Sequence, residues 1–314
     1  MMMRQVILDC DTGRDDAIAI ALACASGDLL RLLGVTTVAG NIPLALTQRN
    51  SRLVLQVCGC HDVPVFAGAD RPLLRPLVTA EAAHGASGIE GVAILEPDVP
   101  LQSQHAVDFI VETLATAAKD SITLVVTGPM TNIALACMRA PELFDRVQEI
   151  VVMGGSSKAR GNATPTAEFN ILVDAEAAAR VLACGRPVTM FGLDVTYQVL
   201  SRTEHRQRME ASGSAAARQL APILSPLPHW NTEKLGPGVV PMHDPCTIAW
   251  LIRPDLFQTK HVNVEVETSS DLTYGETVVD FWNYSGRAPN VLWAHQADGA
   301  AIMDLIVDRI SQLP

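Results

Sequence analysis

Short apolar runs of strand length alternate along this chain with longer segments whose apolar residues recur at helical spacing. Residues 5–9 form the first run, and residues 14–26 then repeat apolar residues around most of a helix. The pattern predicts further strands within 29–41 and at 122–128, 149–155 and 187–194, and helices at 43–57, 105–118 and 174–184. Such alternation is typical of an α/β fold, with a mostly parallel central sheet covered by helices on both faces.

The chain is expected to form a single large domain over residues 1–314. Its 314 residues are 48% hydrophobic and 18% charged, which provides ample material for one core. The least regular part runs from about 201 to 241, where a polar helical pattern precedes a Pro- and Gly-rich stretch. We expect a mobile helical and loop excursion over the functional site there.

The charge balance narrows the range of partners. A net charge of −11 disfavours binding to nucleic acid or to anionic membranes, since both require a basic face. We find no apolar stretch of the roughly 20 residues that span a bilayer and no cleavable signal pattern. The sequence therefore predicts a cytoplasmic protein with a small-molecule ligand, without nucleic acid or membrane as a partner.

The cysteines are interpreted as reduced thiols. There are seven, an odd number, and most lie inside apolar segments, which argues against a disulfide framework. The stretch CGCH at 58–61 would suit a zinc ion only with a second ligand pair at zinc spacing, and none follows. A structural role is the favoured interpretation.

Polar residues follow the apolar strands and indicate where a site lies. Four aspartates, Asp9, Asp11, Asp15 and Asp16, fall within eight positions directly behind the first strand. Ligands of open α/β sheets bind outside the carboxyl ends of the strands, so these groups should share one rim with the polar tips of later strands. Those tips include Asn41, Thr127, Met153 and Asp194.

The negative charges of four crowded carboxylates have to be compensated. They would repel one another and raise their pKa values unless a cation or hydrogen-bond donors were present. N-capping of the following helix explains one aspartate but not four. Because all of these ligands are oxygens, the residues by themselves favour calcium or magnesium.

Two more polar groups are candidates for the same site. In PMHDP (241–245), Asp244 is either a helix cap or a further cation ligand, and His243 would then lie within reach as a proton donor. The stretch GNATPTAEFN (161–170) offers Asn162, Glu168 and Asn170, which are suited to the hydroxyls of a sugar-like ligand.

These residues resemble the motifs of a known family. DCDTGRDD is similar to the D-x-D-P-G-x-D-D signature of the inosine-uridine type nucleoside hydrolases. Eight further blocks follow in the family's order: TTVAGN, HGASGIEG, TGPMTNIALA, VVMGG, GNATPTAEFNI, GLDVT, PMHDP and YGETVVD. PMHDPCTIAWLI looks most like the pyrimidine-preferring bacterial branch. The resemblance implies a nucleoside hydrolase fold with a Rossmann-like core.

It also implies calcium-dependent hydrolysis of the N-glycosidic bond of ribonucleosides in nucleoside salvage, with pyrimidine nucleosides preferred. Carried over by position, the calcium ligands would be Asp11, Asp16, the backbone carbonyl of Thr127, and Asp244. Asp11 would also act as general base toward water, and Asp9 would support the loop. The family further implies a homodimer or homotetramer.

The resemblance assigns the remaining residues to the substrate. His243 would protonate or hydrogen-bond the leaving base, with His84 as the second histidine on that side. The substrate-binding residues would be Asp15, Asn41, His84, Met153, Asn162, Glu168 and Asn170.

Three departures from the family pattern remain open. Thr12 replaces the usual proline, which leaves the loop less rigid or adds a hydroxyl. Tyr274 stands where arginine is frequent and bears either on specificity or on subunit contacts. Residues 225–238 match poorly, so that His229 and Trp230 are either contacts of the base or partly buried loop residues.

Two other functions are compatible with parts of the sequence. A strand ending in D-x-D is also the nucleophile signature of haloacid-dehalogenase-type phosphatases, although Gly-Thr would then follow instead of Thr12-Gly13. A calcium-dependent nucleoside-binding protein without turnover is the second alternative, against which intact Asp11 and His243 count.

Overall fold

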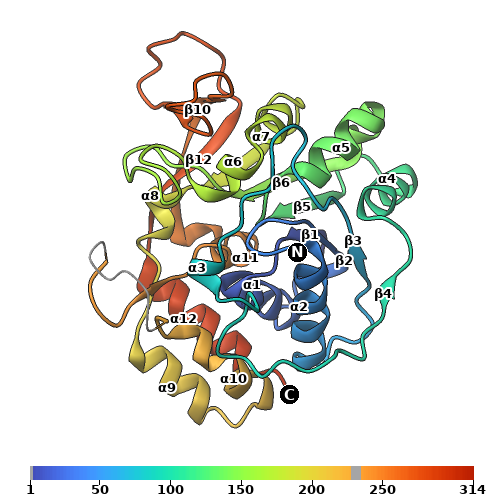
Figure 1. Cartoon of the computed structure of the whole chain (residues 1–314), viewed down its shortest axis with the longest axis vertical. Coiled ribbons are helices and arrows are strands. Elements are labelled where there is room, and N and C mark those ends of the chain that lie inside the picture. Colours follow the sequence, from blue (N-terminus) through green and yellow to red (C-terminus); the bar gives the residue numbers. More distant parts are fainter. Residues whose placement is uncertain (1–2, 228–234) are drawn as a thin grey trace.

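The computed structural model describes residues 3–227 and 235–314, and its centre is a twisted sheet (Figure 1). Within the described residues the strand order is β11-β10-β12-β7-β6-β5-β1-β2-β3-β4. Neighbours from β12 to β4 pair in parallel, whereas β10 pairs antiparallel with both β12 and β11. The expected α/β fold with a mostly parallel sheet is confirmed.

The strands of the sheet are β1 (Arg4–Cys10), β2 (Leu30–Thr37), β3 (Val65–Ala67), β4 (Leu101–Gln102), β5 (Ile122–Val126), β6 (Val147–Met153), β7 (Val188–Phe191), β10 (Phe257–Val266), β11 (Thr277–Asp280) and β12 (Val291–Ala297). The longer helices are α1 (Arg14–Cys24), α2 (Leu44–Val57), α4 (Ala106–Thr116), α5 (Thr131–Arg139), α7 (Ala175–Leu182), α9 (Thr203–Ala211), α11 (Pro245–Ile252) and α12 (Gly299–Ile310). Shorter helices are α3 (Glu81–His84), α6 (Phe169–Val173), α8 (Leu193–Thr196) and α10 (Ala215–Leu220), with 3-10 turns η1 (Pro141–Arg146), η2 (Ala221–Leu224) and η3 (Pro254–Leu256).

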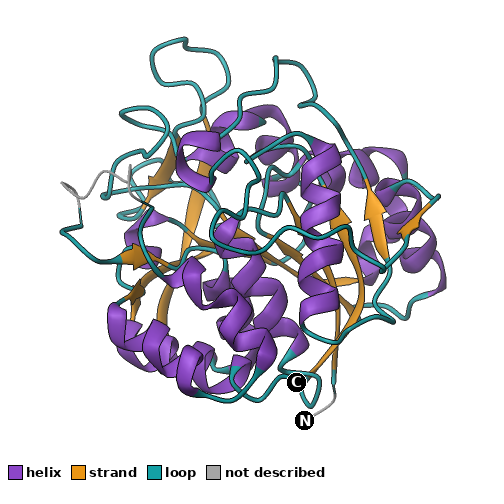
Figure 2. Cartoon of the chain, turned by 60° about the horizontal axis from the view of Figure 1, so that its bottom comes forward, coloured by secondary structure: helices purple, strands orange, loops and turns teal. Residues whose placement is uncertain are grey.

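Helices cover both faces of the sheet, which explains why the central strands are mostly apolar (Figure 2). Successive side chains of a strand point to opposite faces. In β1, Leu8 packs in one core with residues of α1, α11 and α12, whereas Ile7 packs in the other with residues of α4, α5 and α7. Leu124 and Val125 of β5 divide between the two cores in the same way. Both faces of these strands are therefore buried, and most of their positions are apolar. Asp9 and Thr123 are buried polar exceptions.

The segment from 201 to 241 begins with packed helices. α9 contacts α12 and η2, and Met209 and Leu220 are fully buried (Figure 1). The short strands β8 (Leu200–Ser201) and β9 (Val240–Pro241) pair antiparallel beside it. The helical part of the excursion is thus an integral layer of the fold, and mobility stays a prediction. His229 and Trp230 lie outside the described residues.

The seven cysteines are free thiols in this structure. Cys58 is buried in the core around α1 and α2, and Cys60 packs against it. Among the described residues no helix has both the length and the apolar character needed to cross a bilayer.

Candidate active site

The expected site residues meet at the carboxyl ends of the parallel strands. Asp11, Asp15 and Asp16 follow β1, Asn41 follows β2, Thr127 follows β5, and Met153 ends β6. α11 packs against α1 and brings Asp244, just before its first turn, to the same place. Asp9 and Thr127 are 118 positions apart in the sequence, yet the Thr127 N–H donates to the Asp9 carbonyl at 2.9 Å.

Three carboxylates form the acidic centre of this site. One oxygen from each of Asp15, Asp16 and Asp244 lies within 4.8 Å of the others, and Asp16 shares a side-chain hydrogen bond with Asp244. Burial, and after it the charge of Asp15, raises the pKa of Asp16 to about 7. Burial and then the charges of Asp15 and Asp16 hold the pKa of Asp244 well above its usual range. Ionised together, these groups require a cation.

Asp16 is also held by neutral donors. One of its oxygens accepts hydrogen bonds from the Gly13 N–H at 2.8 Å and the Asn41 amide at 3.2 Å. The other accepts from the Thr127 hydroxyl at 2.7 Å. The Thr127 carbonyl meanwhile accepts from the side-chain amide of Asn170 at 2.8 Å. These bonds orient the carboxylate and the carbonyl that the family resemblance assigns to the cation.

Asp11 is the least compensated carboxylate of the group. It is fully buried, and its Oδ2 accepts from the Asn41 N–H at 2.6 Å. Its Oδ1 has no hydrogen-bond partner among the described residues. Burial and then the charge of Asp16 hold the pKa of Asp11 well above its usual range. An orphaned buried carboxylate oxygen beside three other carboxylates fits a bound cation.

Glycines make room for this carboxylate. A Cβ at Gly40 would lie 2.1 Å from Asp11 Oδ2, and one at Gly128 would lie 2.9 Å from Oδ1. Residues with side chains at these two positions would displace Asp11. The two loops that follow β2 and β5 therefore enclose the carboxylate with backbone alone.

Asp9 lies near the end of β1, where it supports the loop that carries Asp11. Its Oδ1 accepts from the Thr36 hydroxyl at 2.5 Å and the Asn132 amide at 2.8 Å. Burial raises the pKa of Asp9 to about 7. Its carboxyl joins β1 to β2 and to α5, so the strand end that carries Asp11 is fixed from both sides.

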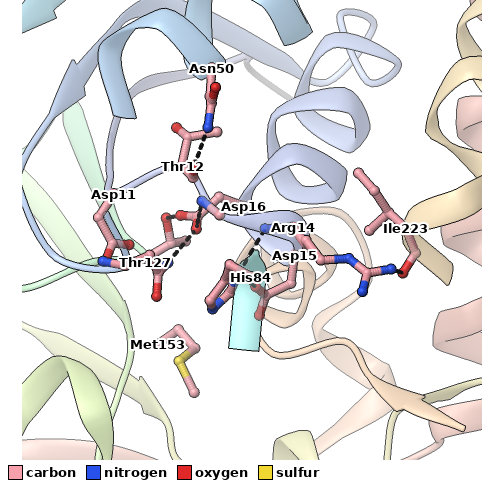
Figure 3. Close-up of polar contacts among 12 residues, drawn as sticks. Asp11, Thr12, Arg14, Asp15, Asp16, Asn50, His84, Thr127, Met153 and Ile223 are labelled. Carbon is pink, nitrogen blue, oxygen red and sulfur yellow. Dashed lines mark hydrogen bonds and ion pairs between the residues drawn. The ribbon is translucent and has the colours of Figure 1, made fainter. Parts of the chain in front are cut away.

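A cavity of about 300 Å³ opens above the acidic centre. Its lining contains every expected substrate residue together with Thr127, Asp244 and His243: Asp15, Asn41, His84, Met153, Asn162, Glu168 and Asn170. Asp11 and Asp16 are fully buried and are not among its lining residues. Figure 3 shows Asp11, Asp16 and Thr127 as a group, with Met153 to one side of them.

The far wall of the cavity is built around Glu168. Its Oε1 accepts from the Asn170 N–H at 3.0 Å, and its Oε2 accepts from the N–H groups of Gly155 at 3.0 Å and Ile171 at 3.2 Å. Glu168 thereby caps α6, and burial raises its pKa to about 7. Asn162 Oδ1 accepts from the Phe169 N–H at 2.9 Å, which ties the 161–170 loop to the same helix.

His84 enters from α3 and packs on residues 11–16. This segment is named the metal loop because the family resemblance assigns its Asp11 and Asp16 to a cation. Its Nδ1 accepts the Arg14 N–H at 3.0 Å, so the proton of the neutral ring sits on Nε2, which is a donor. Burial lowers the pKa of His84 and favours the neutral ring. A Cβ at Gly13 would lie 2.4 Å from Nδ1, so this close approach requires glycine.

His243 is oriented by residues that the sequence analysis did not single out. Its Nδ1 is 2.7 Å from the Thr196 hydroxyl at the end of α8, and its ring meets the edge of Tyr197 with centroids 5.4 Å apart. Thr196 belongs to the GLDVT block, so a motif match was the available signal. Asp194 of the same block lies elsewhere, because its carboxylate accepts the N–H groups of Ser157, Lys158 and Ala159.

The two substituted positions have structural partners. The Thr12 hydroxyl lies 2.6 Å from that of Ser51, and both side chains are fully buried. Thr12 therefore provides a bond between the metal loop and α2. The Tyr274 hydroxyl donates to Glu176, and the Arg75 guanidinium lies 3.7 Å from the centre of the Tyr274 ring. Tyr274 is outside the cavity lining.

A smaller cavity of about 90 Å³ adjoins the first and shares His84, His243, Asp15, Ala83 and Asn162 with it. Its remaining lining is Arg14, Ile223, Val240, Pro241 and Met242. Arg14 was not singled out from the sequence, because it occupies the variable position of the family signature.

A cavity with buried carboxylates at its floor and amide, carboxylate and histidine side chains in its lining offers groups that cleavage of a glycosidic bond requires. The sequence profile of the family "Inosine-uridine preferring nucleoside hydrolase" matches residues 6–304. The chain belongs to this family. It is an N-glycosyl hydrolase that acts on ribonucleosides.

Relatives and solved structures agree with this assignment. The pyrimidine-specific ribonucleoside hydrolase RihA of Escherichia coli (strain SMS-3-5 / SECEC) is 42% identical over 310 residues, covering 98% of this chain and 99% of the relative. An uncharacterized protein of Schizosaccharomyces pombe, C1683.06c, is 43% identical over 310 residues, covering 99% of this chain and 100% of the relative.

Among solved structures, a purine-preferring ribonucleoside hydrolase from Gardnerella vaginalis has a TM-score of 0.87 at 30% identity, covering 98% of both chains. The plant nucleoside hydrolase PpNRh1 has a TM-score of 0.88 at 26% identity, covering 99% of this chain and 100% of that one. The phosphatase alternative is left without support.

Proposed function

We propose that this enzyme hydrolyses pyrimidine ribonucleosides, with a bound calcium ion, in nucleoside salvage. The observation that carries the proposal is the buried acidic centre beneath a cavity lined by both sugar-binding and base-side groups. The pyrimidine preference is inferred from the RihA relative, which is pyrimidine-specific by name. The enzyme is proposed to act in the cytoplasm as a homodimer or homotetramer, which sedimentation measurements would test.

The residues proposed to hold the cation are Asp11, Asp16, Asp244 and the carbonyl of Thr127. They fit a hard divalent ion because all are oxygen donors, three are buried carboxylates, and Asp11 Oδ1 has no partner in the described part of the chain. When bound, the ion supplies charge compensation and makes water easier to deprotonate. We assign calcium over magnesium on the family resemblance.

Asp11 is proposed as the general base. The Asn41 N–H occupies Oδ2, and no donor from residues 3–227 or 235–314 reaches Oδ1, so Oδ1 is the acceptor for a proton from the attacking water. The Asn41 N–H orients the carboxylate, and glycines at 40 and 128 leave room for it. A base held in one orientation loses less entropy on the way to the transition state.

The ribose is proposed to lie against Asp15 and Asn41 on one side and Asn162, Glu168 and Asn170 on the other, above Met153. As the C–N bond breaks, positive charge develops on the sugar ring. Carboxylates that are already fixed, such as Glu168 with its three backbone donors, stabilise this charge without reorganisation.

The departing base gains a proton or hydrogen bonds from the histidine side. His243 is proposed as the donor to the base, held by Thr196 through Nδ1. His84 presents its Nε2 proton to the same cavity, since Nδ1 is occupied by the Arg14 N–H. A pyrimidine depends strongly on such help because its anion is a poor leaving group without it.

The direct test is ribose release from cytidine, uridine, inosine and adenosine by the purified protein, before and after removal of divalent ions. We expect faster release from the two pyrimidine nucleosides, loss of activity in chelator, and recovery with calcium. Equal or faster release from purines would overturn the proposed preference. Full activity in chelator would overturn the calcium requirement.

A further inference from the structure

Arg14 connects the metal loop to the opposite wall of the smaller cavity. It is the first residue of α1, and its side chain points toward Ile223 and away from Asp11 and Thr127 (Figure 3). Its Nη2 donates to three backbone carbonyls, those of Pro222 at 3.0 Å, Ile223 at 2.8 Å and Ser225 at 2.6 Å. Arg14 is only 5% exposed.

The acceptors lie where a helical segment ends. α10 runs directly into η2, which ends at Leu224. The last carbonyls of a helix lack partners within it, although the Pro222 carbonyl also accepts the Ser225 N–H at 3.2 Å. A buried guanidinium provides charged donors for several of them and also compensates the negative end of the helix. Arg14 therefore fixes the position of residues 222–225 and does not simply neutralise a charge.

The backbone of the same residue fixes the other side of the cavity. The Arg14 N–H donates to His84 Nδ1, and the neighbouring Asp15 and Gly13 belong to the metal loop. Ile223, whose carbonyl Arg14 holds, lines the smaller cavity opposite His84 together with Val240. One residue thus sets the spacing between a base-side histidine and the apolar wall that faces it.

We propose that Arg14 is a positioning residue that determines base selectivity, an inference that rests on the proposed function. A purine is larger than a pyrimidine and reaches further from the sugar. A wall held inward by three hydrogen bonds favours the smaller base, because shape complementarity of this kind discriminates by about tenfold or more. Release of the wall would relax the selectivity and weaken pyrimidine binding.

The experiment compares Arg14→Met, which keeps the apolar stem but has no donors, with Arg14→Lys, which keeps the charge with different geometry. Arg186→Met is the matched control, since the Arg186 Nε donates to the Val147 carbonyl at 2.9 Å at the start of β6, the end of the strand remote from the site. Steady-state constants are measured for uridine, inosine and nitrophenyl riboside, and hydrogen exchange is followed over 220–227 without substrate.

For Arg14→Met we expect the uridine-to-inosine ratio of kcat/KM to fall about tenfold or more, mainly through a higher KM for uridine. Exchange over 220–227 should become faster, Arg14→Lys should be intermediate, and Arg186→Met should leave the ratio unchanged. If Arg14→Met does not fold, the ratio for Arg14→Lys decides.

An unchanged ratio in the Arg14 variants, equal losses on both nucleosides, or the same shift in Arg186→Met would overturn the inference while leaving the proposed function intact. Absence of ribose release from every nucleoside by the wild-type protein would instead refute the proposed function and the inference with it.

Discussion

At the scale of single residues, the position of Asp11 is set by what surrounds it. One oxygen is held by the Asn41 N–H, the other lacks a partner among the described residues, and two glycines leave room for the carboxylate in this orientation. The sequence predicted the aspartates and their shared rim from their place after a strand. It could not predict which oxygen would remain without a donor, because that depends on backbone contacts from distant loops.

Replacing Asp11 by Ala should abolish turnover while the fold is retained. General-base groups contribute about 100-fold or more, so ribose release from uridine should fall at least that far. Asp11→Asn, which keeps the size of the side chain, should lose comparable activity. Thermal melting followed by circular dichroism checks the fold, and a variant with more than about a tenth of the wild-type rate would remove Asp11 from this role.

Replacing His243 by Ala should affect substrates unequally. Nucleosides with a poor leaving group should lose far more in kcat than nitrophenyl riboside, whose leaving group departs without a proton. The exposed His261 on β10 provides the control, since His261→Ala should change neither rate. Equal losses on both substrates would show that His243 does not assist departure of the base.

At the scale of elements, the sequence predicted well those strands and helices whose burial is complete. β1 and β5 pack into cores on both faces, so most of their residues are apolar and easy to recognise. The expected strand at 187–194 proved shorter, since β7 ends at Phe191 and the next residues form α8. Burial continues through Val195, which is why apolar content alone could not separate strand from helix.

The three strands β10, β11 and β12, of which β10 pairs antiparallel with the other two, were not predicted. These strands mix buried and exposed residues, as in β11, where Thr277 is buried and Val278 is 53% exposed. A strand with one exposed face at the edge of the sheet carries a weak pattern. His84 was placed on the base side by the family resemblance, but no periodic pattern predicted the four-residue helix α3 that carries it.

The bond between Thr12 and Ser51 joins the metal loop to α2 and should be measurable. Thr12→Val and Ser51→Ala each remove a hydroxyl, and each should lower the free energy of unfolding by about 1 kcal/mol. Because the two groups share one hydrogen bond, the double variant should lose less than the sum of the single losses. Urea denaturation measures all three, and strictly additive losses would show that the two hydroxyls are not coupled.

At the scale of the whole molecule, the acidic centre links stability to pH. Burial raises the pKa values of Asp9, Asp16 and Glu168 to about 7. The folded chain then keeps protons that the unfolded chain releases above about pH 4, so stability without a cation should fall as pH rises toward 7. A cation bound to the ionised carboxylates should reverse this loss.

We therefore expect calcium to raise the melting temperature more at pH 7.5 than at pH 5. The measurement is thermal unfolding at both pH values, in chelator and in calcium, with Asp16→Asn as the comparison. The calcium effect should be reduced in that variant. A shift of the same size at both pH values would contradict ionisation of the acidic centre upon binding.

The floor of the cavity is rigid, which limits how a nucleoside can enter and how ribose can leave. Asp11, Thr127 and Met153 sit at the ends of β1, β5 and β6, which are the central strands and are buried on both sides. Those strands cannot separate without unfolding the protein. Any opening that admits a nucleoside and lets ribose escape must therefore come from the roof, in the stretch that carries His84.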